Sequence, residues 1–191
     1  MFRKMVRIFL SSTFYNFKDE RDELVSVFRE LGEYCKSEGF SFQVLDLRWG
    51  ISDEEGQNNR TLQICFDEIA RCQMLSPKPN FLILSGLYYG WIPLPYVIAE
   101  RVWNKIENEI PVKSILRNWY LQDKNDIEQP YILRARKDGE KGRTEWGAIE
   151  ASLKKELFPL IRKHFPDERK WFDISGLSAT EQEIYKGLFC H

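Results

Sequence analysis

Histidine and cysteine are scarce in this chain of 191 residues. Its two histidines are His164 and His191, and its four cysteines form no C-x-x-C pair. Zinc sites and Ser-His-Asp or Cys-His catalytic sets need these residue types in clusters, so we expect no metal site and no catalytic set of either kind. The sequence also begins without a signal-peptide pattern, and we therefore expect a reduced, cytoplasmic setting.

The chain has no excess of either charge. Its 28 lysines and arginines stand against 29 aspartates and glutamates, for a formal net charge of −1. Such a balance creates no overall field that attracts nucleic acid, so we expect no direct nucleic-acid partner. The local basic run at residues 134–143 is typical of a solvated loop.

Long hydrophobic runs and glycine-rich phosphate loops are also missing. Residues 81–99 have no formal charge, but Gly86, Gly90, Pro93 and Pro95 interrupt them. A membrane span needs about 20 consecutive apolar residues, so this stretch indicates a buried strand followed by a loop, and we expect no membrane partner. The sequence contains neither the Walker A spacing nor G-x-G-x-x-G, which excludes the common phosphate-binding loops.

What the sequence does contain is a β-α-β-α-β pattern in its first half. Apolar runs at residues 6–10, 40–47 and 81–85 are typical of buried strands, and helical periodicity covers residues 16–38 and 61–74. Short connections favour parallel strands with helices on the faces of the sheet. The sequence thus predicts an α/β fold.

The first predicted helix begins with a cluster of carboxylates. Asn16 is a suitable N-cap, and the acidic residues that follow it stabilise the helix dipole. The apolar positions of this helix repeat at the helical period and predict one continuous buried stripe. These positions are Leu24, Val27, Phe28, Leu31, Tyr34 and Cys35.

Polar and aromatic side chains lie where the first two predicted strands end. They are Ser11, Ser12 and Thr13 after the first strand, and Asp46, Arg48 and Trp49 at the end of the second. Ligands of open α/β sheets bind beyond the carboxyl ends of the strands. This edge of the sheet is therefore where we expect the fold to keep a site.

The second half of the chain has weaker periodicity. Helices are predicted at residues 95–109, 144–158 and 178–188, and short strands at 131–134 and 171–174. Pro159 is expected to end or kink the middle helix.

The last predicted helix carries two glutamates with different expected roles. Ser178 and Glu181 have the spacing of a capping box, in which the Glu181 carboxylate accepts a hydrogen bond from the Ser178 backbone N–H. Glu183 points elsewhere because it is two residues further on, and its spacing alone indicates a solvated carboxylate.

Six short motifs run in order along the chain and carry a family resemblance. They are VRIFLSST at residues 6–13, DERDEL at 19–24, DLRWG at 46–50, C-x-x-E-I at 65–69, YGWIP at 89–93 and SATEQEI at 178–184. Together they resemble the TIR-like N-terminal domain of unknown function of NACHT–WD-repeat proteins, which are STAND NTPases, the type seen in the telomerase-associated vault protein. The resemblance implies a flavodoxin-like parallel sheet flanked by helices, with a long insertion after the third strand.

The resemblance also implies a site. Many TIR domains cleave NAD⁺ at the bond between nicotinamide and ribose, and the position of their key glutamate matches Glu183. A carboxylate stabilises the positive charge that develops on the ribose, and no cofactor is needed because NAD⁺ is the substrate. The residues that the resemblance places around NAD⁺ are Ser11, Ser12, Thr13, Asp46, Arg48, Trp49 and Tyr89.

Two departures from the TIR pattern leave two functions open. Ala179 stands where TIR domains carry a tryptophan before the glutamate, and a long stretch separates Tyr89 from the last helix. One function is a signalling domain of immune or stress responses that acts by self-association and works with the NACHT and WD-repeat regions of a parent chain. The alternative is an active NAD⁺ glycohydrolase that uses Glu183.

The expected organisation is one domain over residues 1–191. Its core would comprise residues 5–91 and 168–191, with the insertion at about 92–167. A flavodoxin-like sheet gains another strand after such a last helix, so the resemblance also implies that the chain is cut short of the full domain.

Overall fold

The computed structural model describes residues 4–13, 16–47, 60–136 and 140–190. The chain divides into two compact units. The first unit comprises residues 1–51, 63–91 and 178–191, and the second comprises residues 52–62 and 92–177.

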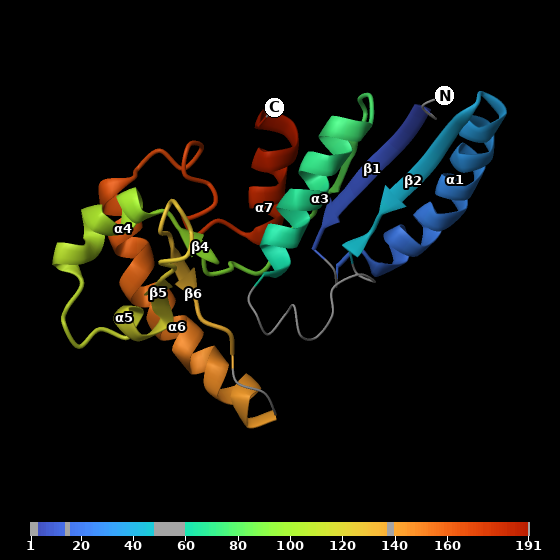
Figure 1. The fold of residues 1–191 in the computed structure, drawn as a ribbon. Coiled ribbons are helices and arrows are strands. Elements are labelled where there is room, and N and C mark those ends of the chain that lie inside the picture. The colour runs from blue at the N-terminus through green and yellow to red at the C-terminus, as the bar shows by residue number, and fades with distance from the viewer. Residues whose placement is uncertain (1–3, 14–15, 48–59, 137–139, 191) are drawn as a thin grey trace. The chain divides into compact units, whose positions relative to one another are not determined.

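The first unit is built on a parallel sheet of three strands. These are β1 (Lys4–Ser12), β2 (Phe40–Leu45) and β3 (Phe81–Leu84), in the order β2-β1-β3 (Figure 1). The central strand β1 pairs through Phe9 with Leu45 on one side and with Phe81 on the other. The predicted parallel α/β fold is confirmed.

Helices cover both faces of this sheet, as a parallel sheet requires. They are α1 (Lys18–Ser37), α3 (Thr61–Leu75) and α7 (Ala179–Ile184), which continues as a π-helical turn at Tyr185–Phe189. Phe28 of α1 packs on Phe42 of β2, with ring centroids 6.4 Å apart. On the other face Arg7 of β1 forms an ion pair of 2.7 Å with Glu68 of α3.

Two details of α1 differ from the prediction. Its N-cap is Phe17, which makes no side-chain capping bond, so the expected cap at Asn16 is wrong. The apolar stripe is also wider than the packed face: Cys35 is buried, whereas Val27, Leu31 and Tyr34 are exposed. The sheet covers only one side of the helix, so periodicity alone overestimated the buried face.

The second unit contains a small antiparallel sheet. Its strands are β4 (Val97–Ile98), β5 (Tyr120–Gln122) and β6 (Tyr131–Leu133), in the order β4-β6-β5. Around them lie α4 (Glu100–Ile106), a 3₁₀ turn at Glu107–Glu109, α5 (Leu116–Trp119) and α6 (Glu140–His164). Trp103 stacks on Tyr131 with centroids 4.3 Å apart, in a core that includes Leu153, Leu157 and Ile161.

Two features of the second unit differ from the prediction. Helix α6 does not end at Pro159 but continues to His164, with Pro159 exposed and Phe158 and Ile161 on either side of it buried in the core. Residues 171–174 form a turn instead of a strand, closed by a hydrogen bond of 3.0 Å from the Ile174 N–H to the Trp171 carbonyl.

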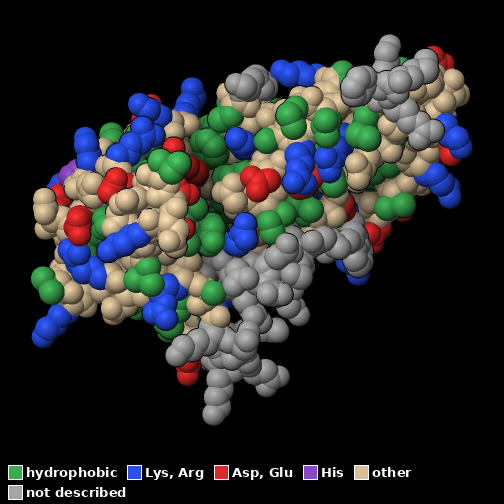
Figure 2. Space-filling model, in the orientation of Figure 1, with side chains coloured by type: hydrophobic (Ala, Val, Ile, Leu, Met, Phe, Trp, Pro, Cys, Tyr) green, Lys and Arg blue, Asp and Glu red, His purple; other side chains and the backbone are tan. Residues whose placement is uncertain are grey.

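The described helices include none that is both long and apolar enough to cross a membrane. Lysines and arginines are interspersed with aspartates and glutamates on the face seen in Figure 2, in keeping with the near-zero formal net charge.

Gly187 provides a test of how the C-terminal turn packs on the sheet. A Cβ atom on Gly187 would lie 2.6 Å from the Phe81 ring, which is stacked at 5.8 Å on Phe9. We expect Gly187→Ala to lower the free energy of unfolding by about 1–3 kcal/mol, measured by urea denaturation. Gly147→Ala is the control: a Cβ atom at this position of α6 would have nothing within 4 Å, so the substitution should be neutral or stabilising. Equal effects of both substitutions would contradict this packing.

Candidate functional site at the carboxyl end of the central strand

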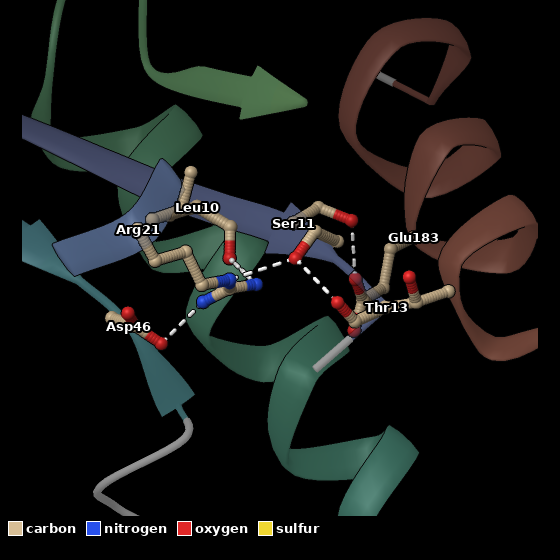
Figure 3. A network of polar contacts seen from close by, with 7 residues as sticks. Leu10, Ser11, Thr13, Arg21, Asp46 and Glu183 are labelled. Atoms are coloured by element: carbon tan, nitrogen blue, oxygen red, sulfur yellow. Dashed lines mark hydrogen bonds and ion pairs between the residues drawn. The ribbon is translucent and has the colours of Figure 1, made fainter. Parts of the chain in front are cut away.

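The last residues of β1 send polar side chains to both faces of the sheet. Ser11 and Ser12 are adjacent, so their side chains point to opposite faces. Both are buried, with 1% and 5% of their surface exposed. Ser11 contacts Glu183 of α7 (Figure 3). Ser12 contacts Arg21 of α1.

Glu183 of α7 is buried at this strand end. The Ser11 hydroxyl donates a hydrogen bond of 2.5 Å to Glu183 Oε2, and the Cys65 thiol of α3 also hydrogen-bonds the carboxylate. Only 8% of Glu183 is exposed. The expectation of a solvated carboxylate is therefore wrong, because Glu183 is enclosed between α7, which carries it, and residues of β1 and α3.

Burial dominates the electrostatics of Glu183. Desolvation raises the pKa of its carboxyl group, while the hydrogen bonds from Ser11 and Cys65 and the positive charge of Arg21 act in the opposite direction. Burial and the neighbouring Glu183 raise the pKa of the Cys65 thiol well above its usual value, so Cys65 is a hydrogen-bond donor here and not a nucleophile.

Arg21 of α1 organises the opposite face of the strand end. It is 1% exposed. Its Nε donates a hydrogen bond of 2.7 Å to Ser12 Oγ, its Nη2 lies 3.5 Å from the Leu10 carbonyl oxygen, and its Nη1 forms an ion pair with Asp46 at the end of β2. A buried guanidinium needs such partners, since an unpaired one would cost several kcal/mol.

Tyr89 holds the start of α7 and is half exposed. Its hydroxyl donates a hydrogen bond of 2.5 Å to Glu181 and accepts one of 3.3 Å from the Ser178 N–H. The Ser178 side chain accepts a hydrogen bond from the Glu181 N–H. The predicted hydrogen bond from the Ser178 N–H to the Glu181 carboxylate is wrong, because both groups bond the Tyr89 hydroxyl instead.

The other residues predicted for the site have different positions. Thr13 packs against Gly90, whose added Cβ would lie 2.9 Å from Thr13 Cγ2, and within the described residues the buried Thr13 Oγ1 has no hydrogen-bond partner. Arg48 and Trp49 lie outside the described residues. The described ranges also contain no group of three or more His, Cys, Asp or Glu that could hold a metal ion.

Sequence reasoning missed Arg21 and the hydrogen bond of Cys65. Arg21 was detectable: it precedes Leu24 by three residues and Phe28 by seven, so it lies on the inward stripe of α1. Cys65 is buried, but no pattern in the sequence links it to Glu183, which lies more than a hundred positions away.

These features define the class of this chain: an α/β domain with a parallel sheet and a buried polar cluster at its carboxyl edge. The chain belongs to a family whose members are described as a domain of unknown function, DUF4062, and the family pattern matches residues 7–183.

Two of the relatives are much longer than this chain, which matches about a tenth of each. The chain is 29% identical over 159 residues to human NACHT domain- and WD repeat-containing protein 1, a match that covers 81% of this chain and 10% of that protein. It is 29% identical over 184 residues to mouse NACHT and WD repeat domain-containing protein 2, covering 93% of this chain and 10% of that protein.

A third relative matches over a shorter region. The chain is 38% identical over 97 residues to mouse telomerase protein component 1, which covers 50% of this chain and 4% of that protein. The chain thus spans about a tenth or less of the length of these relatives. No solved structure matches it.

The buried Glu183 predicts a pH dependence of stability. Its pKa is raised in the folded state from the usual 4.5, so the folded chain holds this proton more tightly than the unfolded chain does. The stability contributed by Glu183 is therefore fully present below pH 4.5 and is lost as the pH rises through the raised pKa. In urea denaturation between pH 4.5 and 7.5, we expect the wild type to lose stability relative to Glu183→Gln as the pH rises. A difference that stays constant or changes in the other direction would contradict the assigned environment.

Proposed function

We propose that this chain is the TIR-like N-terminal domain of a NACHT-type STAND protein and that it signals by self-association in immune or stress responses. The relatives support the setting, because two of them are named for their NACHT and WD-repeat regions. Those regions of a parent chain would bring several copies of this domain together, and the domain would then bind a second copy of itself.

The observation that carries this proposal is the exposed apolar stripe on α1. Val27, Leu31 and Tyr34 are 53%, 38% and 64% exposed. Their spacing of four and three residues places them on one face of the helix. A symmetric dimer uses the same patch on both copies, and a helix stripe of this kind is self-complementary when two helices pack side by side.

A charge placed within the stripe tests self-association. Leu31→Glu would put a carboxylate at a position where the leucine side chain is buried between the two copies. The substitution removes the favourable free energy of burying that side chain, about 1.5–3 kcal/mol, and should weaken association by about 10-fold or more. Sedimentation velocity over a range of protein concentrations measures this change. Ser26→Glu is the matched control, since Ser26 is exposed on α1 and lies off the stripe. Unchanged association of Leu31→Glu would exclude α1 as the contact surface.

A second function, NAD⁺ hydrolysis, is favoured by the position of Glu183. Its carboxylate lies at the carboxyl edge of the sheet, where α/β folds bind ligands. In this reaction the bond between ribose C1′ and the nicotinamide nitrogen breaks, and nicotinamide leaves with the electron pair. A water molecule then adds to C1′ and gives up a proton. The Glu183 carboxylate would stabilise the positive charge that develops on the ribose.

The burial of Glu183 sets a condition on this second function. With 8% of the residue exposed and its Oε2 hydrogen-bonded to Ser11, a ribose hydroxyl reaches the carboxylate only when the side chains around Glu183 move.

Release of nicotinamide tests the second function. We expect the chain, oligomerised by a fused multimeric tag, to release nicotinamide from NAD⁺, and Glu183→Gln to lower the rate by about 100-fold or more, measured by chromatography. Glu168→Gln, an exposed carboxylate of the second unit, is the control and should keep the wild-type rate. Equal rates for wild type and Glu183→Gln would remove Glu183 from the mechanism.

A further inference from the structure

Two opposite charges are buried at the end of one strand. Glu183 and Arg21 are 8% and 1% exposed, and they are held by the neighbouring residues Ser11 and Ser12. The strand places the carboxylate on the α7 side of the sheet and the guanidinium on the α1 side. Charges removed from water attract one another far more strongly than charges on the surface.

The groups around Glu183 can be named for each element that packs against it. Ser11 comes from β1 and Cys65 from α3, and both donate hydrogen bonds to the carboxylate. Arg21 comes from α1, and its positive charge lowers the pKa of Glu183 against the effect of burial. On its own helix, Glu181 is engaged by Tyr89.

We infer that Arg21 is a positioning residue for Glu183: held by Ser12 and Asp46 on one face of the sheet, its guanidinium favours the ionised carboxylate on the other. This inference rests on the proposed use of Glu183 in NAD⁺ cleavage, because only the ionised form stabilises a cationic ribose. Burial alone favours the neutral acid, so the site needs a compensating positive charge that does not itself contact the substrate.

Asp46 modulates the same interaction. Its carboxylate pairs with Arg21 and is 18% exposed. A negative charge beside a guanidinium offsets part of the field that the guanidinium exerts on its surroundings. Loss of Arg21 and loss of the Asp46 charge should therefore act on Glu183 in opposite directions. Substitutions that only loosened the fold would not shift the titration midpoint of Glu183 in opposite directions.

The experiment follows the protonation of Glu183 directly. The full chain is labelled with ¹³C at the glutamate carboxyl carbons, and the Glu183 signal is assigned by its absence in Glu183→Gln. We expect the titration midpoint of Glu183 to move to higher pH in Arg21→Gln and to lower pH in Asp46→Asn, and to stay near the wild-type value in Arg21→Lys. In the cleavage assay, the acid limb of the pH–rate profile should move in the same directions.

An unchanged midpoint in Arg21→Gln, or midpoints that move in the same direction in Arg21→Gln and Asp46→Asn, would overturn the inference. Where Arg21→Gln fails to fold, Asp46→Asn and Arg21→Lys decide alone: a midpoint that does not fall in Asp46→Asn overturns it. The titration needs no NAD⁺ and therefore tests the coupling of Arg21 to Glu183 separately from the reaction. If the chain releases no nicotinamide but the Glu183 midpoint rises in Arg21→Gln and falls in Asp46→Asn, NAD⁺ hydrolysis is refuted and the coupling stands.

Discussion

The alternation of Ser11 and Ser12 at the end of β1 is the constraint on which the polar cluster depends. Buried charged groups persist in a fold only when hydrogen bonds satisfy them. Ser11 provides this for Glu183, and Ser12 provides it for Arg21. Because adjacent strand residues face opposite ways, two serines anchor one helix on each side of the sheet. The same two residues thus fix α1 and α7 against the end of the central strand, and they determine which charges face each other across it.

The element that carries Glu183 depends on tertiary contacts. Helix α7 has six residues, too few to be stable in isolation. Tyr89 holds its start, and at its other end the Gln73 amide donates hydrogen bonds of 3.1, 3.1 and 2.9 Å to the carbonyls of Lys186, Gly187 and Cys190. The position of the carboxylate is therefore a property of the folded unit and not of the helix sequence.

The strands and long helices of the first unit were predictable because each is encoded by a local pattern. The apolar run before Ser11 and the helical period of α1 need no knowledge of the rest of the chain. The environment of Glu183 was not predictable, because its partners Ser11 and Cys65 are more than a hundred residues away in sequence and only the fold brings them together. Arg21 is an intermediate case: its register on α1 indicates that it points inward, but its partner Asp46 becomes evident only when β2 is placed beside β1.

The two proposed functions use opposite faces of the same sheet, and this makes them compatible. The stripe of Val27, Leu31 and Tyr34 lies on α1, whereas Glu183 lies with α7 on the other face. A dimer formed through α1 would leave the carboxylate side uncovered. Arg21 links the two faces, because it projects from α1 and acts on Glu183 through the strand between them. The proposed contact surface and the proposed catalytic carboxylate therefore do not compete for the same face of the sheet.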